Sequence, residues 1–289
     1  MIKSINKVTS HIAQCAINGL TYEFNVTPKP GLVDRNNSGS HKDMDYNTFV
    51  ASSIAIAPFL HEMANTGYYW TGHLKDLFLS LRSIGLEAEK AMFTATNQVN
   101  THKGLIFSLG IVAAAAAFYY KSHGHFHQEN ILLLCSDMTR SVLDAEFKQI
   151  DKKLPKTNGE KLYVYHGIKG IRGEVQEGFP SIRSISLPAL IRLAKTHDNL
   201  NDMLVQVLFH LMAEVEDTNV LSRCGFDALS SVKTSAKEIL AYGGIFSKEG
   251  PEKILSLDTL FIQKKISPGG CADLLAVTIM IYLLGFTFL

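Results

Sequence analysis

Residue types that are suited to binding phosphate or metal ions gather in five stretches of the sequence that lack helical periodicity. These stretches are residues 27–45, 96–104, 167–180, 217–225 and 267–273. Each combines glycine or proline with charged or amide side chains. Binding groups are commonly carried by loops on a rigid scaffold. We therefore expect the five loops to converge on one site, with cationic groups clustered where they meet.

The first of these loops mixes cations with carboxylates. Its charged residues are Lys29, Asp34, Arg35, His41, Lys42, Asp43 and Asp45. Carboxylates suit the octahedral oxygen shell of Mg²⁺, whereas Lys and Arg neutralise phosphate oxygens. The pattern is typical of phosphates bridged by a metal ion. A solvated surface loop is the alternative interpretation.

The second loop leads straight into an apolar segment. Asn100 or Thr101 is expected to be the N-cap of the helix that follows, with Lys103 and Gly104 in its first turn. Backbone amides at a helix N-terminus attract anions, and a neighbouring lysine adds to that attraction. This segment therefore indicates a phosphate-binding position.

The fifth loop has the same organisation. Ser267 is expected as N-cap and Pro268 as the first helical residue, while Gly269 and Gly270 allow close backbone approach. A plain cap for a buried C-terminal helix explains the pattern equally well. The chain has no P-loop, nucleophile-elbow or His-Glu-x-x-His pattern, so familiar kinase, hydrolase and zincin chemistry lacks support.

Composition and periodicity define the scaffold. The chain has 289 residues, of which 46% are apolar and 19% charged, with a net charge of +1. Near neutrality argues against nucleic-acid binding, which normally needs a basic surface. Apolar residues recur at helical spacing, and only residues 161–165 and 182–185 look extended. We predict one all-α domain over residues 1–289 with about ten helices.

Two apolar stretches, residues 104–120 and 274–289, resemble membrane spans. Both fall short of ~20 residues and lack flanking basic and aromatic belts, so buried core helices are expected and no membrane contact. The four cysteines are scattered without a Cys-x-x-Cys pair, as in a protein with reduced thiols. The first residues lack the features of a signal peptide. We therefore expect a cytoplasmic protein.

Taken as a set, the loops resemble one family, the triphosphoribosyl-dephospho-CoA synthases, which make the prosthetic-group precursor of citrate lyase. The matching runs are residues 27–34, 39–44, 99–104, 172–174, 217–219 and 267–270, together with Glu23 and Glu89. They occur in the same order over nearly the whole chain. Residues 33–37 and 41–44 are closer to the citrate lyase branch than to the related malonate decarboxylase branch.

The resemblance implies a transfer in which ATP and 3′-dephospho-CoA give 2′-(5″-triphosphoribosyl)-3′-dephospho-CoA and adenine. The product linkage is α whereas ATP is β, which points to one inverting displacement. An oxocarbenium-like transition state of this kind needs a carboxylate base, an acid or hydrogen bond for the leaving base, and Mg²⁺ on the phosphates.

The resemblance also implies residue roles. The expected substrate-binding residues are Lys29, Arg35, His41, Lys42, Asn100, Thr101, Lys103, Arg172, Asn219, Arg223, Gly269 and Gly270. The expected Mg²⁺ ligands are Glu89, Asp217 and Asp273. Asp43 is the expected general base, with Glu174 as the second choice, and His102 is expected to assist the departure of adenine.

Other functions remain open at this point. The chain is alternatively the equivalent enzyme of malonate decarboxylase, or an N-glycosidase in which water replaces dephospho-CoA. A helical protein that binds a nucleotide or an acyl-carrier partner without turnover is a further alternative. Transient contact with the citrate lyase assembly proteins is also an expectation.

Overall fold

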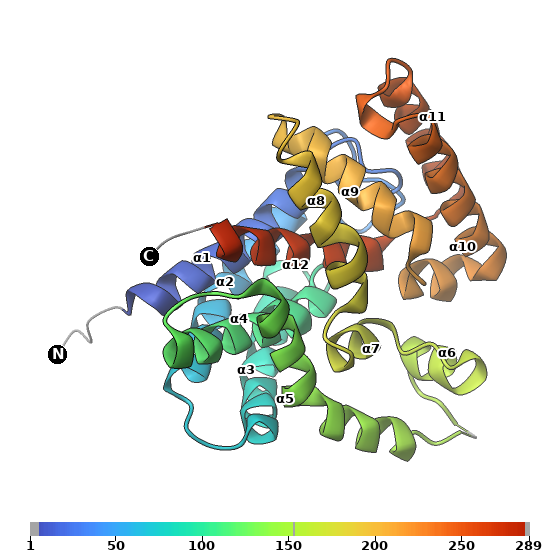
Figure 1. The fold of residues 1–289 in the computed structure, drawn as a ribbon. Helices are drawn as coiled ribbons and strands as arrows, with labels where there is room; N and C mark the ends of the chain where they lie inside the picture. The colour runs from blue at the N-terminus through green and yellow to red at the C-terminus, as the bar shows by residue number, and fades with distance from the viewer. Residues whose placement is uncertain (1–5, 153, 287–289) are drawn as a thin grey trace.

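The computed structural model describes residues 6–152 and 154–286, and all regular structure in these ranges is helical (Figure 1). The α-helices are α1 (Lys7–Asn25), α2 (Tyr46–Tyr69), α3 (Leu74–Ala95), α4 (Lys103–His123), α5 (Gln128–Gln149), α6 (Asn158–His166), α7 (Gly170–Gln176), α8 (Leu187–Leu193), α9 (Leu200–Glu214), α10 (Thr218–Ala241), α11 (Gly250–Lys264) and α12 (Gly269–Phe286). A short π-helix (Ile182–Ser186) and a 3₁₀-helix (Gly244–Phe246) complete the helical structure. The all-α prediction is confirmed, with twelve α-helices in the described ranges rather than ten.

The two predicted extended segments are wrong. Residues 161–165 lie in α6 and residues 182–185 in the π-helix. A capping box begins α6: the Thr157 hydroxyl accepts the Glu160 amide at 3.2 Å, and the Glu160 carboxylate accepts the Thr157 amide at 3.2 Å. This cap outweighs the weak strand preference of the aromatic and β-branched residues that follow it.

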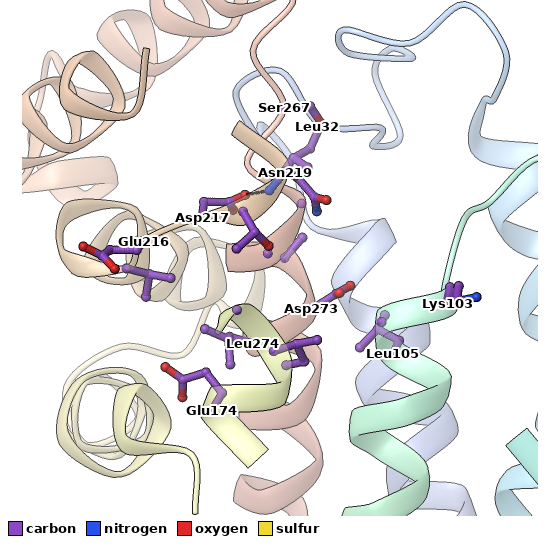
Figure 2. Close-up of a pocket in the computed structure, with 18 of the residues that line it drawn as sticks. Leu32, Lys103, Leu105, Glu174, Glu216, Asp217, Asn219, Ser267, Asp273 and Leu274 are labelled. Atoms are coloured by element: carbon purple, nitrogen blue, oxygen red, sulfur yellow. Dashed lines mark hydrogen bonds between the residues drawn. The ribbon is translucent and has the colours of Figure 1, made fainter. Parts of the chain in front are cut away.

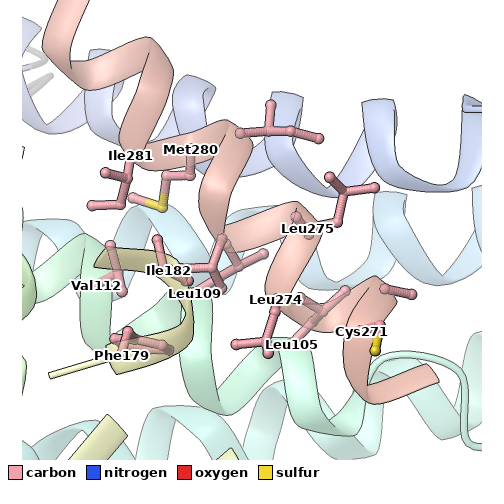
Figure 3. Close-up of a cluster of buried hydrophobic side chains, with 14 of the residues drawn as sticks. Leu105, Leu109, Val112, Phe179, Ile182, Cys271, Leu274, Leu275, Met280 and Ile281 are labelled. Carbon is pink, nitrogen blue, oxygen red and sulfur yellow. The ribbon is translucent and has the colours of Figure 1, made fainter. Parts of the chain in front are cut away.

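Helices α4 and α12 form the centre of the protein. Figure 3 shows apolar side chains of α4, including Leu105 and Leu109, packed beside Leu274 and Leu275 of α12. Both helices are long and apolar enough to cross a membrane, but 72% and 61% of their most apolar windows are buried within the protein. They are core helices, as predicted, because a helix that is apolar all round needs apolar surroundings.

Small residues bring the surrounding helices against this centre. A Cβ atom on Gly19 of α1 would lie 2.5 Å from the carbonyl oxygen of Ala276 in α12. A Cβ on Gly67 of α2 would lie 2.2 Å from the carbonyl oxygen of Ala114 in α4. The backbones of α1 and α2 therefore touch the central pair directly, which fixes where the loops between them emerge.

A kink shapes the beginning of α10. Gly225 has φ +82° and ψ −175°, a conformation that is accessible essentially only to glycine. A Cβ at this position would meet nothing within 4 Å, so the restriction is conformational and not steric. The kink separates the first turns of α10, which carry Asn219 and Arg223, from the long remainder of the helix.

Candidate active site

A cavity of about 760 Å³ lies where the five predicted loops meet, and every one of the five contributes to its lining. Of the 18 predicted site residues, 14 line it. They are Lys29, His41, Asp43, Asn100, Thr101, His102, Lys103, Glu174, Asp217, Asn219, Arg223, Gly269, Gly270 and Asp273. The structure thus brings together residues that are up to 244 positions apart, from Lys29 to Asp273 (273 − 29).

Four predicted residues lie outside the lining. Arg35 reaches Asn201 at 3.4 Å, and Lys42 is exposed on the same loop. Arg172 faces Glu146 of α5 at 3.9 Å. The Glu89 carboxylate forms an ion pair with the ammonium of Lys103 at 2.8 Å. Lys103 lines the cavity, so Glu89 is connected to the cavity through Lys103 and does not line it.

Acidic residues outnumber basic ones around the cavity. The acidic lining residues are Glu23, Asp43, Glu174, Glu177, Glu214, Glu216, Asp217 and Asp273, against the basic residues Lys29, Lys103, Lys169 and Arg223. Of the expected Lys and Arg residues, Lys29, Lys103 and Arg223 lie in the lining, but eight carboxyl groups face four basic side chains, so the lining is not the cationic cluster that the sequence predicted. A ligand with several phosphates would need positive charge beyond what these side chains supply.

Asp217 joins the beginnings of two helices. One carboxylate oxygen accepts the amide of Asn219 in α10 at 2.9 Å (Figure 2). The same oxygen accepts the amide of Val220 at 3.1 Å. The other accepts the amide of Cys271 in α12 at 2.8 Å. Burial raises the pKa of the carboxyl, and these hydrogen bonds act in the opposite direction. The metal role of Asp217 stays a prediction, since both of its oxygens already have backbone partners.

The glycines at the start of α12 accommodate this junction. A Cβ on Gly269 would lie 2.5 Å from the side-chain nitrogen Nδ2 of Asn219, and a Cβ on Gly270 would lie 3.0 Å from a carboxylate oxygen of Asp217. Ser267, the expected N-cap, instead pairs its hydroxyl with His41 Nε2 at 2.9 Å. At α4 the N-cap is His102, and not Asn100 or Thr101 as predicted, although the Asn100 side chain accepts the Lys103 amide at 3.2 Å.

Asp273 projects from α12 toward the first turn of α4 (Figure 2). Among the described residues, none donates a hydrogen bond to its carboxyl. Burial, Glu23 and Asp217 raise the pKa of this carboxyl well above its usual value. A Cβ on Gly104 would lie 2.2 Å from one of its oxygens, so any larger residue at position 104 would displace the carboxyl from this position.

The donor set limits how a metal ion would be held. In residues 6–152 and 154–286, no group of three or more His, Cys, Asp or Glu side chains is placed to hold one. Mg²⁺ commonly takes one or two protein carboxylates and completes its shell with phosphate oxygens and water. Of the three predicted ligands, Asp273 fits this requirement best because its oxygens are not engaged by the protein.

Lys29 is buried, and its positive charge is already neutralised by a neighbouring carboxylate. Its ammonium donates to the Glu23 backbone carbonyl at 2.7 Å and forms an ion pair with the Glu23 carboxylate. At most one of its three N–H groups remains for a phosphate. Its predicted role as a phosphate ligand is thereby restricted to a single contact.

His102 lies in the cavity wall and is 1% exposed. Burial and the charge of Lys29 lower its pKa to about 3. The imidazole is therefore neutral at ordinary pH and holds no extra proton to transfer to a leaving group. Any assistance to adenine would come from a hydrogen bond.

Two further carboxyls border the cavity. Asp43 is 64% exposed and lies 3.8 Å from His41, whose pKa is lowered by burial and by Arg223 against the opposing effect of Asp43. Glu174 is more enclosed and accepts the Ser181 hydroxyl at 2.5 Å, and burial raises its pKa. Both expected base candidates are thus present, one at the rim and one in the wall.

Comparison with known proteins decides the family. Residues 9–287 match the family model of ATP:dephospho-CoA triphosphoribosyl transferase (CitG). The chain belongs to this family. A family relative from Malonomonas rubra, named probable 2-(5″-triphosphoribosyl)-3′-dephosphocoenzyme-A synthase, is 39% identical over 97% of this chain and 90% of its own.

Other triphosphoribosyl transferase relatives agree. A protein of the same name from Vibrio cholerae serotype O1 (strain M66-2) is 38% identical over 96% of this chain and 88% of its own. Protein CitXG from Leuconostoc mesenteroides subsp. cremoris is 36% identical over 94% of this chain, which corresponds to 58% of that longer relative. No solved structure gives a significant match.

Sequence reasoning missed several residues of the transferase cavity, among them Glu177, Glu216 and Lys169 in its lining, and also Ser52 behind it. Lys169 lines it and donates to Gln176 at 2.8 Å. Ser52 is buried in α2 and pairs with His102 at 2.7 Å. Nothing in the sequence distinguishes Ser52 from the adjacent Ser53, because both follow an apolar stretch of the same helix.

Replacing Asp217 by Asn tests the junction between α10 and α12. Asn retains one oxygen to cap α10, but its amide nitrogen cannot accept the Cys271 amide. We expect the free energy of unfolding to fall by about 2 kcal/mol, measured by urea denaturation. Asp45→Asn is the control, because Asp45 caps only its own helix α2. Equal losses in the two variants would contradict the junction.

The low pKa of His102 predicts a pH-dependent stability. The unfolded chain protonates this histidine near 6.5 and the folded chain only near 3, so acidification between these values favours unfolding. One proton corresponds to about 1.4 kcal/mol per pH unit. Between pH 7 and pH 5, wild type should lose more unfolding free energy than His102→Gln. A parallel loss in both proteins would refute the assignment.

Proposed function

We propose that the protein transfers the 5-triphosphoribosyl group of ATP to the 2′-hydroxyl of 3′-dephospho-CoA and releases adenine. Membership of the family and the names of the relatives support this activity. The observation that carries it is the single cavity that all five loops of the family pattern line. Residues 33–37 and 41–44 favour use of the product for citrate lyase.

Phosphate binding draws on backbone as well as side chains. Lys103 and Arg223 line the cavity, and the N-termini of α4 and α12 begin at its wall. Aligned peptide dipoles make helix N-termini electropositive. Asp273 would hold Mg²⁺ there. When bound, the ion would neutralise phosphate charge, which suits a cavity whose carboxyls outnumber its basic side chains.

The chemistry is an inverting displacement at C1′ of the ATP ribose. The C1′–N9 bond breaks and its electron pair leaves with adenine, while the 2′-oxygen of dephospho-CoA bonds to the opposite face of C1′. The hydroxyl loses one proton and adenine gains one, so no further reactant is needed. Asp43 takes the hydroxyl proton, and Glu174 is the second candidate for that role.

The proposed setting is the cytoplasm. All four cysteines are unpaired, and three are buried, as suits a reducing compartment. The product has to be passed on to the proteins that assemble citrate lyase, and transient contact with them is part of this proposal. No particular surface for that contact is assigned.

Adenine release tests the proposal. The protein is incubated with ATP and Mg²⁺, with and without 3′-dephospho-CoA, and free adenine is followed by chromatography. The transferase predicts adenine mainly when dephospho-CoA is present. Release from ATP alone would indicate an N-glycosidase, and binding of ATP without release would indicate a non-catalytic nucleotide-binding protein.

Asp43→Asn tests the base. The amide cannot accept the hydroxyl proton, so turnover should fall by at least about a hundredfold while the circular dichroism spectrum is unchanged. Asp45→Asn, two residues further along the same loop, is the matched control and should retain turnover within about twofold. Near-normal turnover of Asp43→Asn would shift the role to Glu174.

A further inference from the structure

A chain of three polar side chains leads from α2 to the cavity. The Thr101 hydroxyl donates to Ser52 Oγ at 2.7 Å, and Ser52 Oγ pairs with His102 Nδ1 at 2.7 Å. Ser52 and His102 are buried, and His102 lines the cavity. The other ring nitrogen, His102 Nε2, has no hydrogen-bond partner among the described residues although it is buried.

The hydrogen-bond donors and acceptors of Thr101, Ser52 and His102 indicate which ring nitrogen of His102 is protonated. If Nδ1 accepts, the Ser52 hydroxyl accepts a hydrogen bond from Thr101 and donates one to His102. Of these three side chains, the one polar group without a partner is then Nε2–H of His102. If Nδ1 carries the proton, Ser52 accepts twice, so both its own hydrogen and the Nε2 lone pair lack a partner. Each buried unmet donor costs about 1–3 kcal/mol, so the first arrangement is favoured.

The surroundings of His102 indicate what Nε2–H meets. The Phe49 ring meets the imidazole edge-on at 4.8 Å between centroids. Leu32, Met44, Phe49 and Leu105 line the same cavity. The charge of Lys29 disfavours protonation of the His102 ring to a second cation. A neutral donor among apolar side chains suits a ring nitrogen of a nucleobase better than a phosphate, which would lose its hydration there.

We propose that Ser52, oriented by Thr101, is a positioning residue that fixes the His102 tautomer, so that Nε2–H donates a hydrogen bond to the adenine that leaves. The inference rests on the proposed transferase function and adds to it. Negative charge grows on adenine as the C1′–N9 bond breaks, and a hydrogen bond that strengthens with that charge accelerates the step. His102 keeps its proton throughout.

Nuclear magnetic resonance of the ring nitrogens tests the tautomer directly. In the full-length protein labelled with ¹⁵N-histidine, His102 is assigned by its absence from His102→Gln. We expect protonated Nε2 and an Nδ1 that accepts a hydrogen bond, with the Nδ1 shift altered in Ser52→Ala. A protonated Nδ1 in wild type would overturn the proposal. This readout does not depend on catalytic activity.

Steady-state kinetics test the consequence for the reaction. Ser52→Ala should lower kcat for adenine release about tenfold, the value of one hydrogen bond, with the KM of both substrates within twofold. Ser53→Ala is the matched control, since its hydroxyl donates to the Phe49 carbonyl of its own helix at 2.7 Å and should leave kcat within twofold. In a protein that already carries His102→Gln, the further change Ser52→Ala should lower kcat by less than twofold.

A change of leaving group separates assistance from a structural role. The triphosphate of 2-fluoroadenosine carries a base that departs more readily and needs less help. With this substrate, Ser52→Ala should lower kcat by less than about threefold. A general disturbance of the site would lower kcat equally with ATP and with the 2-fluoroadenosine triphosphate. Equal effects would refute the proposal. A wild-type protein that releases no adenine would refute the transferase function, while the tautomer measurement would still stand.

Discussion

The carboxylate of Asp217 holds together the part of the molecule on which the site depends. Helices α10 and α12 begin about 50 residues apart in the sequence (269 − 218), yet one side chain accepts amides from both. Taking a carboxyl out of water is costly, and three backbone amides offset that cost at the point where each helix has donors without intrahelical partners. The junction brings Asn219 and Arg223 of α10 into the lining of the same cavity as Asp273 of α12. The glycines at the start of α12 are needed for the same approach, so they serve the packing of the helices as well as any ligand.

The charge distribution gives the cavity a different character from that of a simple phosphate pocket. A phosphate pocket built from lysines and arginines would bind anions without help, whereas here the carboxyls are in excess and the buried Lys29 is compensated by Glu23. Under the proposed function, positive potential would come from helix amides and from a Mg²⁺ ion that arrives with the nucleotide, so nucleotide binding would be coupled to metal binding. Burial and the charge of Lys29 keep His102 neutral in the cavity wall.

The sequence predicted the helical scaffold and the convergence of the loops more reliably than the direction of individual side chains. Runs as apolar as those of α4 and α12 have no stable place except a core, so their burial follows from composition. Loops that carry glycine and charge between such helices have to lie at their ends. By contrast, Lys42 and Arg172 are on the correct loops but lie outside the lining, because only tertiary packing decides which way a long side chain points. Ser52 could not be recognised at all, since its role depends on a histidine 50 residues away.

The direct contact between α1 and α12 also has a consequence for biosynthesis. The first and last helices of the described chain pack backbone against backbone at Gly19 and Ala276, and α12 supplies Asp273 to the cavity. On the ribosome, α1 emerges early and has to wait for nearly the whole chain before its partner appears. A nascent chain without α12 therefore lacks Asp273 and one wall of the cavity.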